Sequence, residues 1–212
     1  MLKLDIPNNP DYGYDNGKSI GFHSDQEGDM IMEQTVKAKE RKSTALFICM
    51  TALATAIICV ATMVIQIPIP LGYAHLGDSC ILLASVFFGW KTGIFAGGVG
   101  SAMADFLTGY SQWVLPTLII KSVQGFLIAK ICRNREGEFK ILSVRTALAV
   151  AAGILEMVLG YVAGGAILAG SMAAGIASAP GLLLKGVLNI AVFYVVALAL
   201  EKSGVKKFIP VK

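Results

Sequence analysis

Charged residues are scarce in this chain, and the sequence motifs of several enzyme classes are missing from it. Only 15% of its 212 residues are Asp, Glu, Lys or Arg, while 55% are hydrophobic. This balance lies outside the range of ordinary soluble domains and indicates an integral membrane protein. The phosphate-binding loop GxxxxGK[ST] is absent, because the stretch from Gly13 to Ser19 is one residue too short and follows no strand. We therefore expect that the chain does not hydrolyse ATP by itself.

Metal-binding and nucleophile motifs are also missing. The sequence has no HExxH, and its four cysteines lack CxxC spacing, so they indicate neither a zinc site nor a disulfide framework. Residues 17–21 match GxSxG, but a nucleophile elbow needs a strand-to-helix turn, and this stretch lies in a polar tail. We expect no metal, no cofactor and no enzymatic activity, and thus a protein that binds or transports a ligand.

Long apolar runs take the place of these motifs and predict an all-α membrane protein, a bundle of six transmembrane helices. At 1.5 Å per residue, the second and third runs would cover only about 18 and 24 Å of a hydrocarbon core of about 30 Å. Their ends should leave non-helical backbone at membrane depth, which is tolerated only where protein or a water-filled cavity covers it. The predicted spans are 43–66, 78–89, 93–108, 116–132, 145–170 and 178–200.

These runs divide the chain into three parts. Residues 1–42 are polar and rich in turn formers, and they predict a mostly disordered cytoplasmic tail because they lack the apolar surface needed to fold alone. Residues 43–201 are expected to form the six-helix substrate-binding domain, and residues 202–212 a short basic cytoplasmic tail. We expect no second globular domain, since six spans and their loops take up the remaining length.

The distribution of positive charge predicts the topology. All but two of the 18 Lys and Arg residues fall in segments that a six-span threading places on one side of the membrane, and the loops 67–77, 109–115 and 171–177 contain none. By the positive-inside rule, both termini are expected in the cytoplasm. The basic residues cluster at helix ends, where orientation and anionic lipid account for them, so no nucleic-acid partner is indicated.

Five ionisable residues fall within or at the edge of the predicted spans. Asp78, Asp105, Lys121 and Lys185 share the outer half of the bundle, whereas Glu156 lies near mid-depth. Two carboxylates and two ammonium groups at one depth can neutralise each other, which lowers the cost of keeping them in the membrane. The simpler interpretations are that the carboxylates cap helix ends and that the lysines snorkel outward. Their common leaflet favours a shared ligand site.

The outer loops at the same level add aromatic and polar groups. The loop 67–77 is stiffened by two prolines and hinged by two glycines, which predicts a lid. Aromatic walls with few polar groups suit a small heteroaromatic solute, although the same aromatic residues are typical of an interfacial belt. Gln124 and Asn189 lie on the helix faces of Lys121 and Lys185 and are expected to line the same interior. The loop residues expected to line the site are Tyr73, His75, Tyr110, Gln112 and Trp113.

Three stretches resemble a known family of membrane proteins. The segments Leu71–Ser79, Gly100–Tyr110 and Pro116–Lys121 look like those of the substrate-binding S component of an energy-coupling factor (ECF) vitamin transporter of the riboflavin type. The similarity extends over roughly residues 45–200. The resemblance implies a prokaryotic plasma-membrane protein of six helices that binds one vitamin near its outer face. It also implies association with a membrane coupling subunit (the T component) and two ATPases.

The resemblance also implies roles for individual residues. Relatives carry an Ala-x-x-x-Ala motif on the first helix that contacts the coupling subunit, and Ala52 and Ala56 match it, although small residues at this spacing also allow contacts within the bundle. Lys185 resembles a lysine of the flavin-binding branch. Riboflavin, a pyridoxine-like compound and a pyrimidine precursor are the candidate ligands. The alternatives are a stand-alone proton-coupled transporter, with the buried Asp and Lys residues as proton carriers, and a membrane enzyme that acts on lipid.

Overall fold

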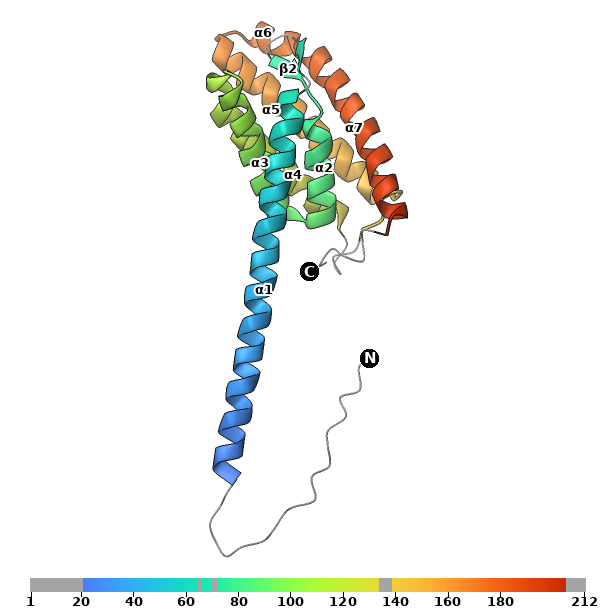
Figure 1. The fold of residues 1–212 in the computed structure, drawn as a ribbon. Helices are drawn as coiled ribbons and strands as arrows, with labels where there is room; N and C mark the ends of the chain where they lie inside the picture. Colours follow the sequence, from blue (N-terminus) through green and yellow to red (C-terminus); the bar gives the residue numbers. More distant parts are fainter. Residues whose placement is uncertain (1–20, 65, 70–71, 134–138, 205–212) are drawn as a thin grey trace, which may run out of the picture. The chain divides into compact units, whose positions relative to one another are not determined.

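The computed structural model describes residues 21–64, 66–69, 72–133 and 139–204. These residues form helices, one 3-10 turn and a small hairpin (Figure 1). In chain order the elements are α1 Gly21–Val64, β1 Ile67–Ile69, β2 Gly72–Ala74, α2 Gly77–Phe88, α3 Trp90–Leu107, η1 Ser111–Trp113, α4 Val114–Cys132, α5 Val144–Ala169, α6 Met172–Ala177 and α7 Ala179–Lys202.

The chain divides within α1, between Leu46 and Phe47, into two compact units. In the described part of the first unit, residues 21–46 are helical, and the Nζ atom of Lys37 lies 2.5 Å from the Oε1 atom of Glu33 one turn away. These helical residues overlap the tail expected from the sequence, and residues 1–20 of that tail lie outside the described part of the chain. The second unit contains all the other helices and both strands.

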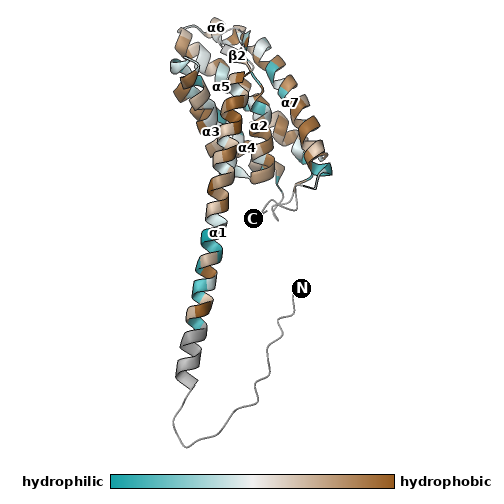
Figure 2. Ribbon diagram, in the orientation of Figure 1, coloured by the Kyte–Doolittle hydropathy of each residue, from teal (hydrophilic) through white to brown (hydrophobic). Residues whose placement is uncertain are grey.

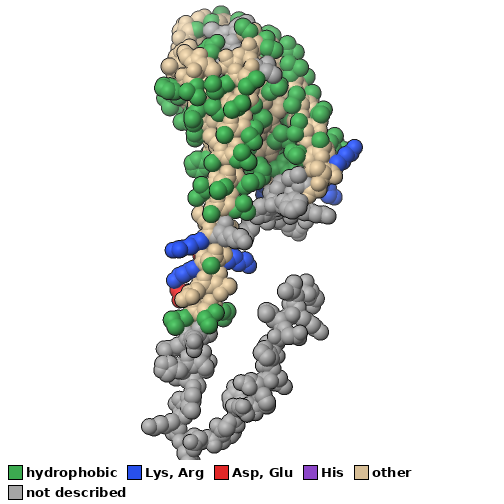
Figure 3. All heavy atoms as spheres, in the orientation of Figure 1, with side chains coloured by type: hydrophobic (Ala, Val, Ile, Leu, Met, Phe, Trp, Pro, Cys, Tyr) green, Lys and Arg blue, Asp and Glu red, His purple; other side chains and the backbone are tan. Residues whose placement is uncertain are grey.

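Within the described part of the chain, four helical segments are long and apolar enough to cross a membrane. Their apolar residues colour most of the bundle brown in Figure 2, and Figure 3 shows hydrophobic side chains over most of its visible face. Such exposed apolar surface is what a lipid-facing helix requires, so the expected all-α membrane class is confirmed, while the count of six and the sides of the termini stay predictions. The four segments are Asp29–Val64, Ser111–Cys132, Val144–Ala169 and Met172–Lys202.

The second apolar helix is as short as the sequence predicts. With 12 residues, α2 covers about 18 Å and begins at the end of the loop 67–77. It ends at Gly89, whose φ of 89° lies in the left-handed region that glycine adopts without strain. The guanidinium of Arg133 donates to the carbonyl of Phe87 at 2.9 Å, which satisfies part of the free C-terminal end of α2. The helix α2 is therefore shorter than the 18 residues required of the candidate membrane spans.

Glycines let α3 approach α4 closely. A Cβ atom on Gly125 would lie 2.3 Å from the carbonyl oxygen of Gly93, and one on Gly97 would lie 3.0 Å from the carbonyl oxygen of Lys121. A Cβ at Gly100 would lie 2.8 Å from the carbonyl oxygen of Thr55 on α1. The small residues of α3 thus serve contacts within the bundle, and the close approach of α4 brings Lys121 against the neighbouring helices.

The part of α1 that belongs to the second unit presents two different faces. Ala54 and Ile58 are buried and pack with Ile81 of α2. Ala52 and Ala56 lie on the exposed face. The alanine pair singled out from the sequence therefore does not serve the packing of this bundle in the way that the glycines of α3 do.

The loop 67–77 contains a short antiparallel hairpin that was not predicted from the sequence. Ile67 pairs with Ala74 and Ile69 with Gly72. Each strand has three residues, and β2 packs against α7. Figure 1 shows β2 and the short helix α6, which lies in the loop expected at 171–177, at the same end of the bundle. The hairpin connects α1 to the first turn of α2, where the polar residues of the bundle gather.

Candidate functional site

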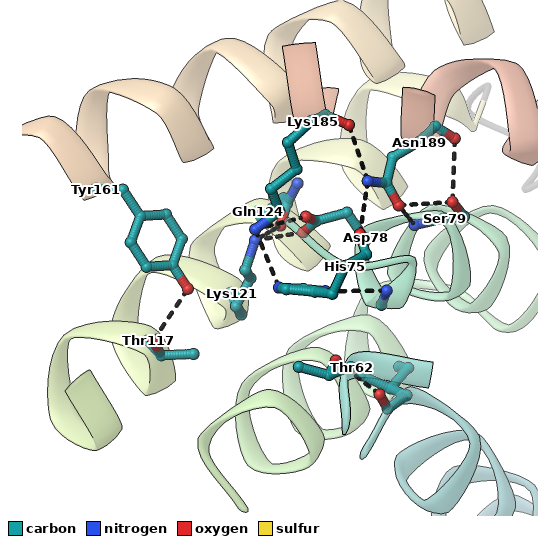
Figure 4. Close-up of polar contacts among 12 residues, drawn as sticks. Thr62, His75, Asp78, Ser79, Thr117, Lys121, Gln124, Tyr161, Lys185 and Asn189 are labelled. Carbon is teal, nitrogen blue, oxygen red and sulfur yellow. Dashed lines mark hydrogen bonds and ion pairs between the residues drawn. The ribbon is translucent and has the colours of Figure 1, made fainter. Parts of the chain in front are cut away.

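Asp78 is the centre of a buried ionic cluster. It lies in the first turn of α2, and its side chain is fully buried. Its Oδ1 atom accepts a hydrogen bond from the ammonium of Lys121 on α4, and its Oδ2 atom lies 3.1 Å from the Nζ atom of Lys185 on α7 (Figure 4). The lysine side chains are 0% and 3% exposed. Three helices thus each contribute one charged group to a site without contact to solvent.

An aromatic ring and an amide complete the surroundings of the two lysines. Lys121 donates a second hydrogen bond, at 3.1 Å, to the Oε1 atom of Gln124 one turn further along α4. The Nζ atoms of Lys121 and Lys185 lie 5.0 and 5.3 Å from the ring centroid of Tyr161 on α5. The face of an aromatic ring carries partial negative charge and attracts both cations. The hydroxyl of Tyr161 lies 3.0 Å from the Oγ1 atom of Thr117, which holds the ring in place.

His75 links the outer loop to this cluster. Its Nδ1 atom accepts a hydrogen bond from the backbone N–H of Gly77 at 3.0 Å, and its Nε2 atom lies 3.0 Å from Nζ of Lys185. Burial, and then the nearby Lys185, lower the pKa of this loop histidine well below its ordinary value. A neutral imidazole has only one acceptor nitrogen. When the Gly77 N–H donates to Nδ1, the Nε2 atom carries the ring proton and faces the ammonium of Lys185, which also donates. The contact between His75 and α7 is therefore poorly matched and easy to exchange for another.

Asn189 ties the loop and α2 to α7. Its Nδ2 atom donates to the carbonyl oxygens of His75 and Lys185, both at 2.9 Å. Its Oδ1 atom accepts from the backbone N–H of Ser79 at 2.8 Å and lies 2.6 Å from the Ser79 hydroxyl. The N-cap residue of α2, Leu76, makes no side-chain capping bond. The Ser79 N–H also donates to the Leu76 carbonyl at 3.1 Å, so a side chain from another helix adds a second acceptor in the first turn of α2 and fixes Asp78 beside the lysines.

The aromatic residues of the second outer loop differ in their positions. Trp113 is buried, with its ring centroid 5.5 Å from that of Tyr161. Tyr110 is half-buried and Gln112 is exposed. Asp105 is buried near the end of α3, and its carbonyl oxygen accepts a hydrogen bond from the backbone N–H of Tyr110 at 2.8 Å. Trp113 therefore extends the aromatic wall that Tyr161 begins.

The structure brings together a connected set of residues from the expected site. The side chain of Tyr73 lies outside the described residues, although its backbone pairs with Pro68. Glu156 on α5 interacts electrostatically with Lys121 and Asp78, so it belongs to the surroundings of the cluster. The expected residues that make direct contacts with one another are His75, Asp78, Lys121, Gln124, Lys185 and Asn189.

Three residues of the cluster were missed as site candidates from the sequence. The ring of Tyr161 lies beside both lysine ammonium groups, and its hydroxyl lies within hydrogen-bond distance of Thr117. The hydroxyl of Ser79 donates a hydrogen bond to the side-chain oxygen of Asn189. A tyrosine in an apolar span is only a weak indication of a binding residue, because tyrosines also occur in ordinary packing. Tyr161 therefore could not be singled out from the sequence. Thr117 and Ser79 carry no signal of their own, since small hydroxyl residues often bond to their own helix backbone.

The side chains of the cluster have the chemistry that suits a polar, flat ligand. The two lysines offer donors and positive charge, and the carboxylates offer acceptors. Tyr161 and Trp113 offer ring faces. Apolar helices surround these groups, so each contact forms in a medium of low polarity in which hydrogen bonds and charges count for more than in water.

Most of the chain matches a known protein family. Residues 42–203 match the family described as ECF-type riboflavin transporter, S component. A protein of Pyrococcus woesei, described as "Uncharacterized protein in gap 3'region", is 43% identical over 107 residues, which cover 50% of this chain and 68% of that protein. The family match includes every residue of the ionic cluster and both alanines of the exposed pair on α1.

Proposed function

Since the chain belongs to the family of S components of ECF-type riboflavin transporters, we propose that it captures riboflavin at the outer side of a prokaryotic plasma membrane and passes it inward as part of a larger transporter. Membership makes the chain a membrane protein and a vitamin-transport subunit rather than an enzyme. The substrate, the binding residues and the partners below are parts of the proposal.

The buried cluster around Asp78 is the observation that carries this function. Two lysines, each 3% exposed or less, share one carboxylate beside the ring of Tyr161. Ionisable side chains inside a membrane bundle are costly and mark ligand or ion pathways by default. Riboflavin offers a flat ring system with carbonyl acceptors and a polyhydroxyl chain, which match the aromatic wall and the donors of Lys121 and Lys185.

The loop 67–77 acts as the lid in this proposal. Its hairpin leads into His75, which contacts Lys185 and Gly77, and Asn189 holds the His75 carbonyl. Loss of the contact between the His75 and Lys185 side chains would free the imidazole from α7 without breaking a well-matched hydrogen bond. Opening then begins with loss of this contact, while the Asn189 hydrogen bond to the His75 carbonyl keeps the base of the loop attached to α7.

The exposed face of α1 is the proposed contact with the coupling subunit. Ala52 and Ala56 lie on it, and Ala56 also lines a groove with Ile57, Val60 and Leu76. Small residues at a four-residue spacing allow close approach of another helix. In this proposal two ATPases bound to that subunit supply the energy, and the distribution of basic residues supports a cytoplasmic location for both termini.

The test is vitamin uptake by liposomes that contain this chain. With the coupling subunit, both ATPases and internal ATP, we expect riboflavin uptake that survives dissipation of the proton gradient and is lost on replacing Ala52 and Ala56 by Leu. Val195→Leu, on the exposed face of α7, is the matched control and should retain uptake. Uptake by the chain alone that collapses with the proton gradient would contradict the proposal and support a proton-coupled transporter.

A further inference from the structure

Apart from the Oδ2 atom of Asp78, which is ion-paired with Lys185, two buried polar atoms near the ionic cluster have no hydrogen-bond partner among the described residues. They are the Nε2 atom of Gln124 and the Oε2 atom of Glu156. Gln124 is fully buried at 0% exposure. A buried amide or carboxylate without a partner costs about 1–3 kcal/mol or more. Each such atom in a native structure requires an explanation, and in a binding protein a ligand that supplies the missing partner is one.

The packing of α4 on α5 places the two side chains at the same level. A Cβ atom on Gly153 would lie 3.7 Å from the Cγ atom of Gln124, and one on Gly160 would lie 2.9 Å from the Cγ1 atom of Ile120. Glu156 lies between these glycines, three residues after one and four before the other, and so on the same face of α5. It therefore faces α4 at the level between Gln124 and Ile120, one turn from Lys121.

The orientation of the Gln124 amide follows from its other contact. Its Oε1 atom accepts from the ammonium of Lys121 at 3.1 Å. An amide turned the other way would point its two N–H groups at a group that only donates. The Nε2 atom is therefore the end that faces away from Lys121, with two hydrogens to donate. Glu156 as a carboxylate only accepts.

We propose that Gln124 and Glu156 read one edge of the ligand, a carbonyl next to a ring N–H as in a cyclic imide. The Gln124 amide donates to the carbonyl oxygen, and the Glu156 carboxylate accepts from the adjacent N–H. The pyrimidinedione ring of a flavin has this edge, and a pyridoxine-like ring lacks it. This assignment rests on the proposed function and makes the pair a determinant of specificity within the same site.

The same chemistry has a second source. An aminopyrimidine also presents an acceptor nitrogen beside an N–H. Its ring nitrogen would accept from the Gln124 amide, and its amino group would donate to the Glu156 carboxylate. A site that hydrogen-bonds an N–H or carbonyl of its ligand discriminates strongly against an analogue that lacks it, because the protein group is then left unpaired. Methylation of the ring nitrogen therefore tests the pair directly, since it removes the N–H and leaves the rest of the ligand unchanged.

The experiment compares lumiflavin with 3-methyllumiflavin by fluorescence quenching on the purified full chain. The wild type is expected to bind the methylated compound roughly 10- to 100-fold more weakly. Glu156→Met, which keeps length and removes the acceptor, should bind lumiflavin more weakly and show less than about a threefold difference between the two compounds. Glu156→Gln retains a neutral acceptor and should show an intermediate difference. Gln124→Glu retains the acceptor for Lys121, loses the donor and should weaken both compounds.

The outcomes distinguish capture of a flavin by this chain from recognition of the flavin edge by Gln124 and Glu156. Lys202→Met, at the exposed end of α7, is the control and should behave as the wild type, and each variant must melt as one cooperative unit within a few degrees of it. Equal discrimination in the wild type and in Glu156→Met would overturn this inference while the capture of a flavin stands. No flavin binding by the wild type, with binding of a 4-aminopyrimidine that depends on Glu156, would support the edge and overturn riboflavin as the substrate. No binding of any of these compounds would overturn both.

Discussion

Removal of the Asp78 carboxylate should destabilise the bundle more than removal of either lysine. Asp78 is the shared partner of Lys121 and Lys185, and their three side chains are 0–3% exposed. Asp78→Asn leaves two buried ammonium groups without this counter-charge, whereas Lys121→Met or Lys185→Met leaves a balanced pair. Breaking a buried ion pair by removing one partner costs about 3–5 kcal/mol, and the loss of one hydrogen bond within a surviving pair costs about 1–2 kcal/mol.

These values translate into melting temperatures. For a chain of this size, 1 kcal/mol shifts the midpoint by roughly 2–4 °C. Asp78→Asn should lower the midpoint by roughly 6–20 °C and each single lysine variant by roughly 2–8 °C. The double variant Lys121→Met/Lys185→Met leaves the buried Asp78 carboxylate without either lysine partner. Its melting temperature should therefore resemble that of Asp78→Asn rather than reflect the sum of the two single changes. This non-additivity is the signature of a shared partner.

The assay is thermal unfolding of the ligand-free chain in detergent, followed by circular dichroism and by the fluorescence of its tryptophans. Lys202→Met removes an exposed lysine at the end of α7 and serves as the control, with a shift below about 2 °C. The reasoning is refuted if Asp78→Asn melts with the wild type, or if either single lysine variant loses as much as Asp78→Asn.

Three other substitutions test separate parts of the structure. Asn189→Leu removes the hydrogen bonds to Ser79 and His75 and should lower the free energy of unfolding by about 2–4 kcal/mol. Val187→Leu, on the exposed face of the same helix, is the control and should lower it by less than about 0.5 kcal/mol. Equal melting temperatures of the two variants would contradict the role of Asn189. Gly125→Leu should prevent folding, seen as aggregation in size-exclusion chromatography, because even a Cβ atom would lie 2.3 Å from the Gly93 carbonyl oxygen; a monodisperse product of normal yield would show that α3 and α4 do not need this approach. His75→Phe keeps a ring and removes both nitrogen contacts, so riboflavin should dissociate several-fold faster in stopped-flow fluorescence; an unchanged dissociation rate would exclude His75 from the lid.

The helices and the charged centre could be predicted from the sequence because their signals are local. A long apolar run identifies a helix, and an isolated lysine within it identifies a buried cation that needs a partner. Depth along each run was enough to place Asp78, Lys121 and Lys185 together. The short α2 also followed from counting residues between the loop and Gly89.

The contacts that complete the site depend on helix rotation and crossing, which periodicity does not specify when a helix is apolar on all sides. Tyr161 reaches both lysines only because the glycine face of α5 lets that helix approach α4. Asn189 was expected to line the interior, but its role as a cap for α2 requires knowledge of which helix lies beside it. The hairpin in the loop 67–77 was missed because three-residue strands, one of which contains a proline, carry little strand signal.

The most direct test of the account is calorimetric titration of riboflavin into the purified chain without ATP or any partner, in parallel with Lys185→Met and the control Lys202→Met. The account predicts one site per chain with a dissociation constant in the nanomolar range for the wild type and the control. It also predicts at least about a tenfold loss for Lys185→Met, since a buried donor to the ligand is removed. No heat of binding to the wild type, or equal affinity in all three proteins, would contradict capture of the vitamin by the buried lysine cluster.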